Sequence, residues 1–120
     1  MIKKIAFIGH PVRDLERAKK FYGEILGLEM TMSHEDKWCE FDTPEGKSIG
    51  LDTFSPEGTP PYMALETDDI EAEVSRLEVL GAQVKQRIRN HVVMRAPGGH
   101  TFCVVPVARS DFDTNAAIWP

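Results

Sequence analysis

This sequence has few cysteines, fewer basic than acidic residues, and no long run of apolar residues. Cys39 and Cys103 are its two cysteines, too few for a disulfide framework or a zinc motif, so we expect thiols in a reducing compartment. The 14 basic residues are outnumbered by 19 acidic ones, and the formal net charge of -5 argues against nucleic acid as a partner. No stretch approaches the ~20 apolar residues that cross a bilayer, and no signal region is visible. We therefore expect a cytoplasmic protein with neither a membrane nor a nucleic-acid partner.

What the sequence does contain fits a single folded domain. Its 120 residues with 42% hydrophobic content supply one core of ordinary size. Lys85, Arg87 and Arg89 are spaced by two, which places them on one face of a strand that we interpret as solvated.

The sequence repeats itself. The segment Val12–Glu16 and the later Gly27 resemble Thr67–Glu71 and the later Gly81. Asp14 lies 55 residues before Asp69, Gly27 lies 54 before Gly81, and Pro44 lies 53 before Pro97. A period of roughly 50 residues predicts two similar modules, and the surface between two such copies is where we expect a ligand to be enclosed.

Each module has the hydrophobic pattern of a β-α-β-β-β unit. The first has a strand at 3–9, a helix from the Asp14 cap to Gly27, and strands near 28–33, 37–42 and 48–53. The second has a strand at 62–67, a helix at 70–80, and strands near 83–88, 91–96 and 101–106.

These elements divide the single domain of residues 1–120. We expect module one at about 3–54, a proline-rich linker at 55–61, module two at about 62–106, and a tail at 107–120. The tail carries Phe112, Ile118 and Trp119, which we expect to dock on an apolar surface.

Several motifs together resemble the vicinal oxygen chelate superfamily, which includes glyoxalase I, fosfomycin and bleomycin resistance proteins and the extradiol dioxygenases. They are Asp-Leu-Glu-Arg-Ala with Phe-Tyr and Leu-Gly-Leu in 14–28, Leu-Glu-Thr-Asp-Asp-Ile in 65–70, Leu-Gly-Ala in 80–82 and Ala-Pro-Gly-Gly-His-Thr-Phe in 96–102. The resemblance covers residues 3 to 106. It implies an α+β fold of two β-α-β-β-β modules whose sheets curl into half-barrels, a homodimer, and a small molecule bound in the resulting cup. Enzymatic members usually hold a divalent metal there.

The resemblance also locates the metal ligands of the enzymatic members, which are His, Glu or Gln on the first and last strands of each module. Those positions fall on Phe7, Gly50, Tyr62 and Cys103. A phenyl ring or a glycine offers no oxygen or nitrogen donor to a divalent cation. We therefore expect no metal ligands and no cofactor.

The four histidines do not restore such a site. His10 is an odd step from Phe7 and precedes a proline, His34 falls in an expected hairpin loop, and His100 falls in a Gly-Gly-His turn. His91 differs from these because the repeat matches it to Trp38. An unusual metal site of His91 with Glu40 and Asp52 is the one metal hypothesis left open.

Strand alternation predicts which side chains face the cup. Trp38 and Glu40 share one face of their strand, as do Ser48, Gly50 and Asp52, while Cys39 and Phe41 face the helix. The predicted lining is mixed aromatic and acidic and consists of Phe7, Trp38, Glu40, Asp52, Tyr62, Glu66, His91 and Cys103. It suits a small organic ligand stacked on Trp38 or Tyr62, with a carboxylate that accepts an amine or hydroxyl. The alternative is that Phe7, Tyr62 and Cys103 fill a barrel too tight for a ligand.

Three functions follow from this lining. The first is a metal-independent protein that binds a small molecule. The second is a lyase, isomerase or dioxygenase for a small metabolite, with Glu40, Asp52, Glu66 or His91 as the general base or, less in keeping with its apolar surroundings, Cys103 as a nucleophile. The third is a structural role in assembly, with a closed cup and an adhesive tail. We favour the first.

Overall fold

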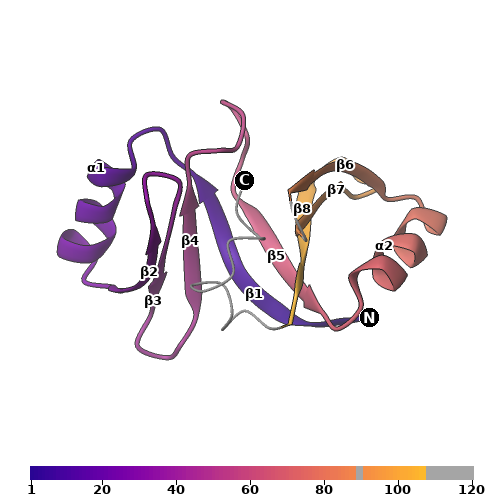
Figure 1. Ribbon diagram of the computed structural model, residues 1–120, viewed down its shortest axis with the longest axis horizontal. Helices are drawn as coiled ribbons and strands as arrows, with labels where there is room; N and C mark the ends of the chain where they lie inside the picture. The colour runs from indigo at the N-terminus through magenta and orange to yellow at the C-terminus, as the bar shows by residue number, and fades with distance from the viewer. Residues whose placement is uncertain (89–90, 108–120) are drawn as a thin grey trace. The chain divides into compact units, whose positions relative to one another are not determined.

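The computed structural model describes residues 1–88 and 91–107. Arg89 of the basic strand and the tail residues Phe112, Ile118 and Trp119 lie outside the described residues. The elements in chain order (Figure 1) are β1 (Ile2–Pro11), α1 (Leu15–Lys20), η1 (Phe21–Ile25), β2 (Glu29–His34), β3 (Trp38–Asp42), β4 (Ser48–Asp52), β5 (Tyr62–Thr67), α2 (Ile70–Val79), β6 (Gln83–Ile88), β7 (His91–Arg95) and β8 (Thr101–Pro106). The predicted α+β class and the repeated β-α-β-β-β order are confirmed.

The chain forms two compact units, and the boundary between them lies inside β1. The N-terminal unit is Phe7–Pro61, and the C-terminal unit combines Met1–Ala6 with Tyr62 onward. Met1 and the first residues of β1 are tied to the rest of the C-terminal unit by ion pairs. The Met1 ammonium lies 3.4 Å from Glu73 Oε1, and Lys4 Nζ lies 3.6 Å from Glu66 Oε2.

The N-terminal unit is a sheet with α1 packed on one face. Its strand order is β2-β3-β4-β1; β3 is antiparallel to both neighbours, whereas β1 and β4 run parallel. The core under α1 consists of Leu15 from the helix and of apolar side chains at alternate strand positions, namely Cys39, Phe41 and Leu51. Asp14 caps α1, since its side chain accepts a hydrogen bond of 3.0 Å from the Arg17 amide.

The predicted single helix from Asp14 to Gly27 is wrong in its second half. Phe21–Ile25 form the π-helix η1, in which the Leu26 amide donates to the Phe21 carbonyl at 2.9 Å. The wider turn exposes large apolar side chains, with Ile25 at 72% and Phe21 at 45%. The spacing of apolar residues does not distinguish a π-turn from an α-turn. It reflects which side of the helix is buried, and it carries no information on which backbone carbonyl accepts each amide hydrogen bond.

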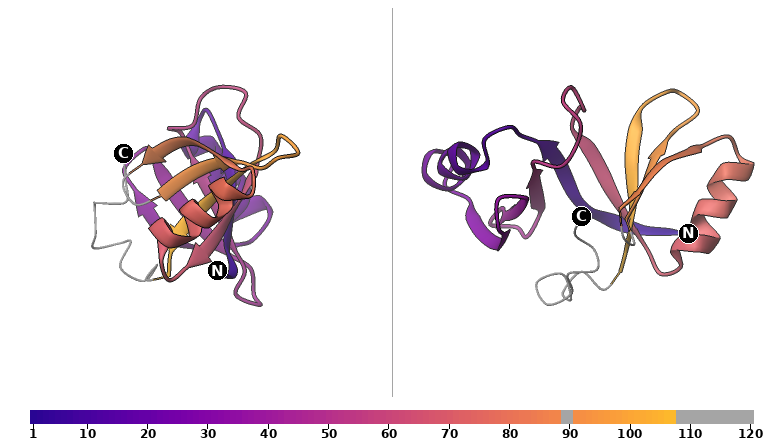
Figure 2. Two further views of the ribbon diagram at one scale, coloured as in Figure 1. Left: turned by 90° about the vertical axis from the view of Figure 1, so that its right-hand side faces the viewer. Right: turned by 45° about the horizontal axis from the view of Figure 1, so that its top comes forward.

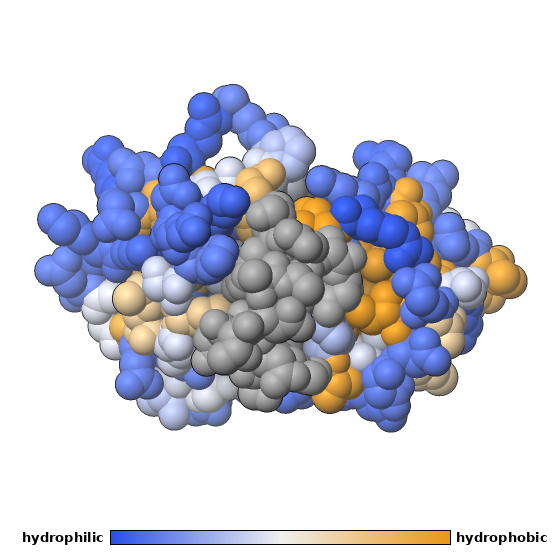
Figure 3. Space-filling view, in the orientation of Figure 1, coloured by the Kyte–Doolittle hydropathy of each residue, from blue (hydrophilic) through white to orange (hydrophobic). Residues whose placement is uncertain are grey.

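The C-terminal unit repeats this plan with α2 as its helix (Figure 2). Its strand order is β5-β8-β7-β6 beside the first half of β1. Its core includes Val74, Val92, Met94, Phe102 and Val104. Figure 3 shows apolar side chains gathered over the strands beside α2, whereas hydrophilic ones dominate the visible face near α1. None of the helices in residues 1–88 and 91–107 has the length and apolar character that a membrane crossing requires.

A buried carboxylate links α2 to the start of the chain. Glu73 is 2% exposed and accepts two hydrogen bonds from Arg76, 3.1 Å from Nε and 2.7 Å from Nη2. These charge-assisted hydrogen bonds lower the pKa of Glu73 below its usual value of 4.5.

Because the folded-state pKa of Glu73 is lowered, its stabilisation is complete above about pH 4.5 and declines as the pH falls through the folded-state value. We expect Glu73→Gln to reduce the free energy of unfolding at pH 7 by roughly 1–2 kcal/mol. The stability of this variant should also depend less on pH in the acid range. Urea unfolding between pH 3 and 7 measures both effects.

Glu71→Gln is the matched control on the same helix. Glu71 is exposed and pairs with exposed Arg87 at 3.0 Å, so its loss should change the unfolding free energy by less than about 0.5 kcal/mol. Equal losses in the two variants would show that burial of the Glu73 carboxylate adds nothing to the strength of its ion pair.

Candidate functional site

The structure brings four of the predicted residues together in the N-terminal unit. Trp38 is the Cα partner of Asp52, and Glu40 is the partner of Gly50. Partners across a strand pair share a face, and this face is the one opposite the α1 core. The ring of Phe7, from β1, lies on the same face and contacts the ring of Trp38.

Trp38 is at the centre of this group. Its side chain is buried, and the Phe7 ring meets it edge-on with centroids 5.0 Å apart. The ring of Phe54 stacks on it at 6.2 Å with an interplanar angle of 22°. Phe54 is not among the predicted residues, although its spacing of two from Asp52 continues the alternation of β4 past the end of the strand.

Gly50 makes room for the indole. A Cβ atom at this position would lie 2.3 Å from Trp38 Cη2, 2.5 Å from Trp38 Cζ2 and 3.1 Å from Phe7 Cδ1. Such distances overlap van der Waals radii. The glycine is therefore required by the ring that covers it, and any side chain at residue 50 would displace Trp38.

Two carboxylates border the aromatic rings. Glu40 is 4% exposed and Asp52 is 0% exposed. Trp38 Nε1 donates to Glu40 Oε2 at 3.1 Å, and the Ser55 amide donates to Asp52 Oδ1 at 2.9 Å. Buried carboxylates next to apolar rings favour a ligand that donates hydrogen bonds or carries positive charge, and they disfavour an anion.

The other four predicted residues share a face of the C-terminal unit. Tyr62, Glu66, His91 and Cys103 are all less than 9% exposed. The register pairs Ala64 with Cys103 and Glu66 with Val105, so alternation places these residues opposite the core under α2. His91 begins β7 as Trp38 begins β3, which confirms the match that the repeat predicted.

The remaining histidines and Cys39 lie elsewhere. His10 is exposed near the end of β1, and His100 is exposed before β8. His34 was expected in a loop, but it ends β2, because β2 and β3 stay paired as far as His34 and Trp38. Burial raises the pKa of the Cys39 thiol to about 11, so this cysteine under α1 is protonated at neutral pH and unsuited to nucleophilic attack.

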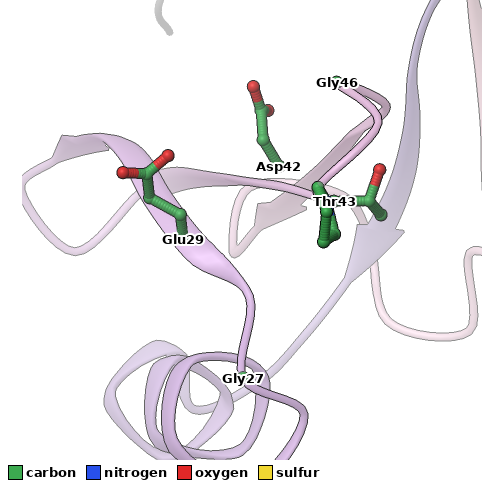
Figure 4. Close-up of a pocket in the computed structure, with 6 residues that line it drawn as sticks. Gly27, Glu29, Asp42, Thr43 and Gly46 are labelled. Atoms are coloured by element: carbon green, nitrogen blue, oxygen red, sulfur yellow. The ribbon is translucent and has the colours of Figure 1, made fainter.

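A surface hollow of about 320 Å³ lies in the N-terminal unit, at the opposite end of β3 from Trp38 (Figure 4). Carboxylates from two neighbouring strands, Glu29 and Asp42, line it, and Asp42 Oδ1 also accepts a hydrogen bond of 2.8 Å from Ser48 Oγ. None of the predicted site residues lines this hollow.

The arrangement is that of the vicinal oxygen chelate fold, and solved structures share it. A benzaldehyde dehydrogenase from Legionella pneumophila, described as NAD-dependent, has a TM-score of 0.70 at 13% identity, over 83% of this chain and 96% of that one. A glyoxalase/bleomycin resistance protein/dioxygenase superfamily member from Vibrio splendidus 12B01 has a TM-score of 0.60 at 17% identity, over 88% and 99%. The Mn(II)-bound glyoxalase from Novosphingobium aromaticivorans has a TM-score of 0.62 at 20% identity, over 88% of this chain and 39% of that one.

The family model of the glyoxalase-like domain matches residues 7–105. The chain therefore belongs to the glyoxalase-like domain family. No curated protein matches it.

Two of the four metal-ligand positions that the family resemblance implies carry no ligand for a divalent cation. Phe7 and Gly50 supply no donor atom, and the Trp38 ring covers the Cα of Gly50. Within residues 1–88 and 91–107, no three side chains of His, Cys, Asp or Glu are grouped so that they could hold a metal ion. His91 belongs to the C-terminal unit, whereas Glu40 and Asp52 belong to the N-terminal unit, so a metal held by these three residues stays a prediction of the sequence.

The contact between Trp38 and Gly50 can be tested by a double-mutant cycle. We expect Gly50→Ala to lower the free energy of unfolding by roughly 1–3 kcal/mol, because the added methyl group overpacks the indole. In a Trp38→Leu background the same change should cost much less, with a coupling energy of at least about 1 kcal/mol. Urea unfolding of the four proteins measures both quantities.

Gly98→Ala is the control. A Cβ there would meet nothing closer than His100 Nδ1 at 3.8 Å, so the loss should stay within about 0.5–1 kcal/mol. Additive effects of the Gly50 and Trp38 changes would contradict the steric account.

Proposed function

We propose that this protein binds a small organic molecule, with an aromatic or apolar body and an N–H or O–H donor, without the divalent metal of its enzymatic relatives. The observation that carries this proposal is the Trp38 ring packed over Gly50, where the family resemblance places a metal ligand. At that position the chain has an aromatic contact and no donor atom for a metal.

The chemistry of the N-terminal face supports a ligand of this class. Rings bind apolar bodies and cations through their surface and their π-electrons. The buried oxygens of Glu40 and Asp52 accept hydrogen bonds and repel anions. Sites for small molecules commonly combine such an apolar wall with a few polar groups that set orientation.

Metal-free catalysis stays a prediction of the sequence. Glu40, Asp52, Glu66 and His91 are buried carboxylates and an imidazole, the kinds of group that act as general bases when a substrate is within hydrogen-bond reach. Binding without turnover is the simpler function that the same residues support.

The proposal predicts a preference among three probes of one size: benzyl alcohol, benzylamine and benzoate. We expect the first two to change the emission of Trp38, in a Trp119→Phe background that leaves it the single tryptophan, with Kd on the order of 1 mM. Benzoate should bind at least about tenfold more weakly, because its carboxylate meets buried carboxylates. Treatment with EDTA should leave these affinities unchanged.

The control is a thermal-shift titration of Trp38→Leu, which removes both the fluorophore and the ring. Its response to benzyl alcohol and benzylamine should fall if the ring is part of the site. Binding that appears only with an added divalent ion, or no binding by any probe, would contradict the proposal.

A further inference from the structure

Glu66 is a buried acid in the C-terminal unit. It lies on β5, on the face turned away from the α2 core, and is 2% exposed. Its Cα partner on β8 is Val105, which is 0% exposed. A carboxylate in apolar surroundings has lost its hydration, so each oxygen needs a hydrogen-bond donor from the protein or from a ligand.

One carboxylate oxygen of Glu66 lies near the positive charge of Lys4 but accepts no hydrogen bond from the described residues. Oε2 accepts none within residues 1–88 and 91–107. Lys4 Nζ lies 3.6 Å from it, which is longer than a hydrogen bond, and the Lys4 side chain is 70% exposed. The ammonium therefore balances the negative charge from the solvent side, while the buried acceptor stays open to another donor.

The same face of β5 carries buried, largely apolar side chains beside this acceptor. Tyr62 lies four residues before Glu66, about 13 Å away at the usual rise of a strand. Between them lies Ala64, whose Cα partner is Cys103. Short side chains thus separate a phenol ring from an open carboxylate oxygen, an arrangement that matches a molecule with an apolar body and a donor at one end.

We propose that Glu66 is the anchoring acceptor of a ligand site on this face, and that it selects a neutral hydroxyl or N–H donor over an ammonium group. This inference rests on the proposed function, because it names the group that orients a small organic ligand in one of the two units.

The preference for a neutral donor follows from Lys4. A ligand ammonium bonded to Oε2 would lie within a few ångströms of the Lys4 ammonium, in a partly buried place where like charges repel strongly. A hydroxyl group makes the missing hydrogen bond without adding a charge. Removal of the Lys4 charge should therefore reverse the preference.

The test is an NMR titration of the isotopically labelled full chain with benzyl alcohol and with benzylamine, read at the amides of β5 and β8. We expect benzyl alcohol to bind this face more tightly than benzylamine. Glu66→Met, which removes the acceptor at similar length, should weaken benzyl alcohol binding at least about tenfold, and Glu66→Gln should retain part of the affinity. Lys4→Met should strengthen benzylamine binding about tenfold relative to benzyl alcohol.

Lys3→Met is the control, because Lys3 is a neighbouring exposed lysine that pairs with exposed Asp68 at 3.5 Å. It should leave both affinities unchanged. Binding at the Trp38 face that is unaffected by Glu66→Met would overturn this inference while the proposed function stands, and binding of neither probe would overturn both. Glu66→Met changes a buried residue and could unfold the chain, whereas Lys4→Met changes an exposed one. If Lys4→Met left the preference for benzyl alcohol over benzylamine unchanged, the selection of a neutral donor would be overturned whatever the outcome for Glu66→Met.

Discussion

The packing of the Trp38 ring over the bare Cα of Gly50 is the contact on which the N-terminal face depends. It excludes any side chain from residue 50, because even a methyl group would lie 2.3 Å from the indole. It also fixes the position of the indole nitrogen, which donates to buried Glu40. The same steric requirement thus explains why residue 50 is glycine, how the Trp38 ring is oriented, and which donor the Glu40 carboxylate receives.

The two copies of the repeat have diverged in where they carry charge. In the N-terminal unit the acids are Glu40 and Asp52, and the repeat matches them to Val93 and Val105. In the C-terminal unit the acid is Glu66, matched to Pro11. The duplicated backbone therefore has carboxylates in one unit where the other has valines, and the two faces differ in chemistry more than in fold.

The repeat and the alternation of strand residues predicted the elements and the buried faces, because both follow directly from which side chains avoid water. They missed the π-turn at Phe21–Ile25, because a π-turn differs from an α-turn only in which backbone carbonyl accepts the hydrogen bond from a given amide. They also missed the assignment of Met1–Ala6 to the C-terminal unit, where ion pairs with Glu66 and Glu73 hold the chain. Phe54 was overlooked because it lies beyond the end of β4, where alternation is no longer enforced by pairing.

A metal site and an aromatic site place different demands on the side chains of such a fold. A divalent cation requires several donors that converge within about 2–2.6 Å of one point, so replacing one or two of them weakens the whole set. An aromatic contact requires only that apolar surface is buried, and its stabilising energy increases with each ring that joins it. Phe7 and Gly50 stand where the family resemblance implies metal ligands, and the Trp38 ring is buried against both of them. Glu40 and Asp52 lie beside these rings and accept hydrogen bonds from Trp38 Nε1 and the Ser55 amide, so the sheet itself supplies donors to both carboxylates.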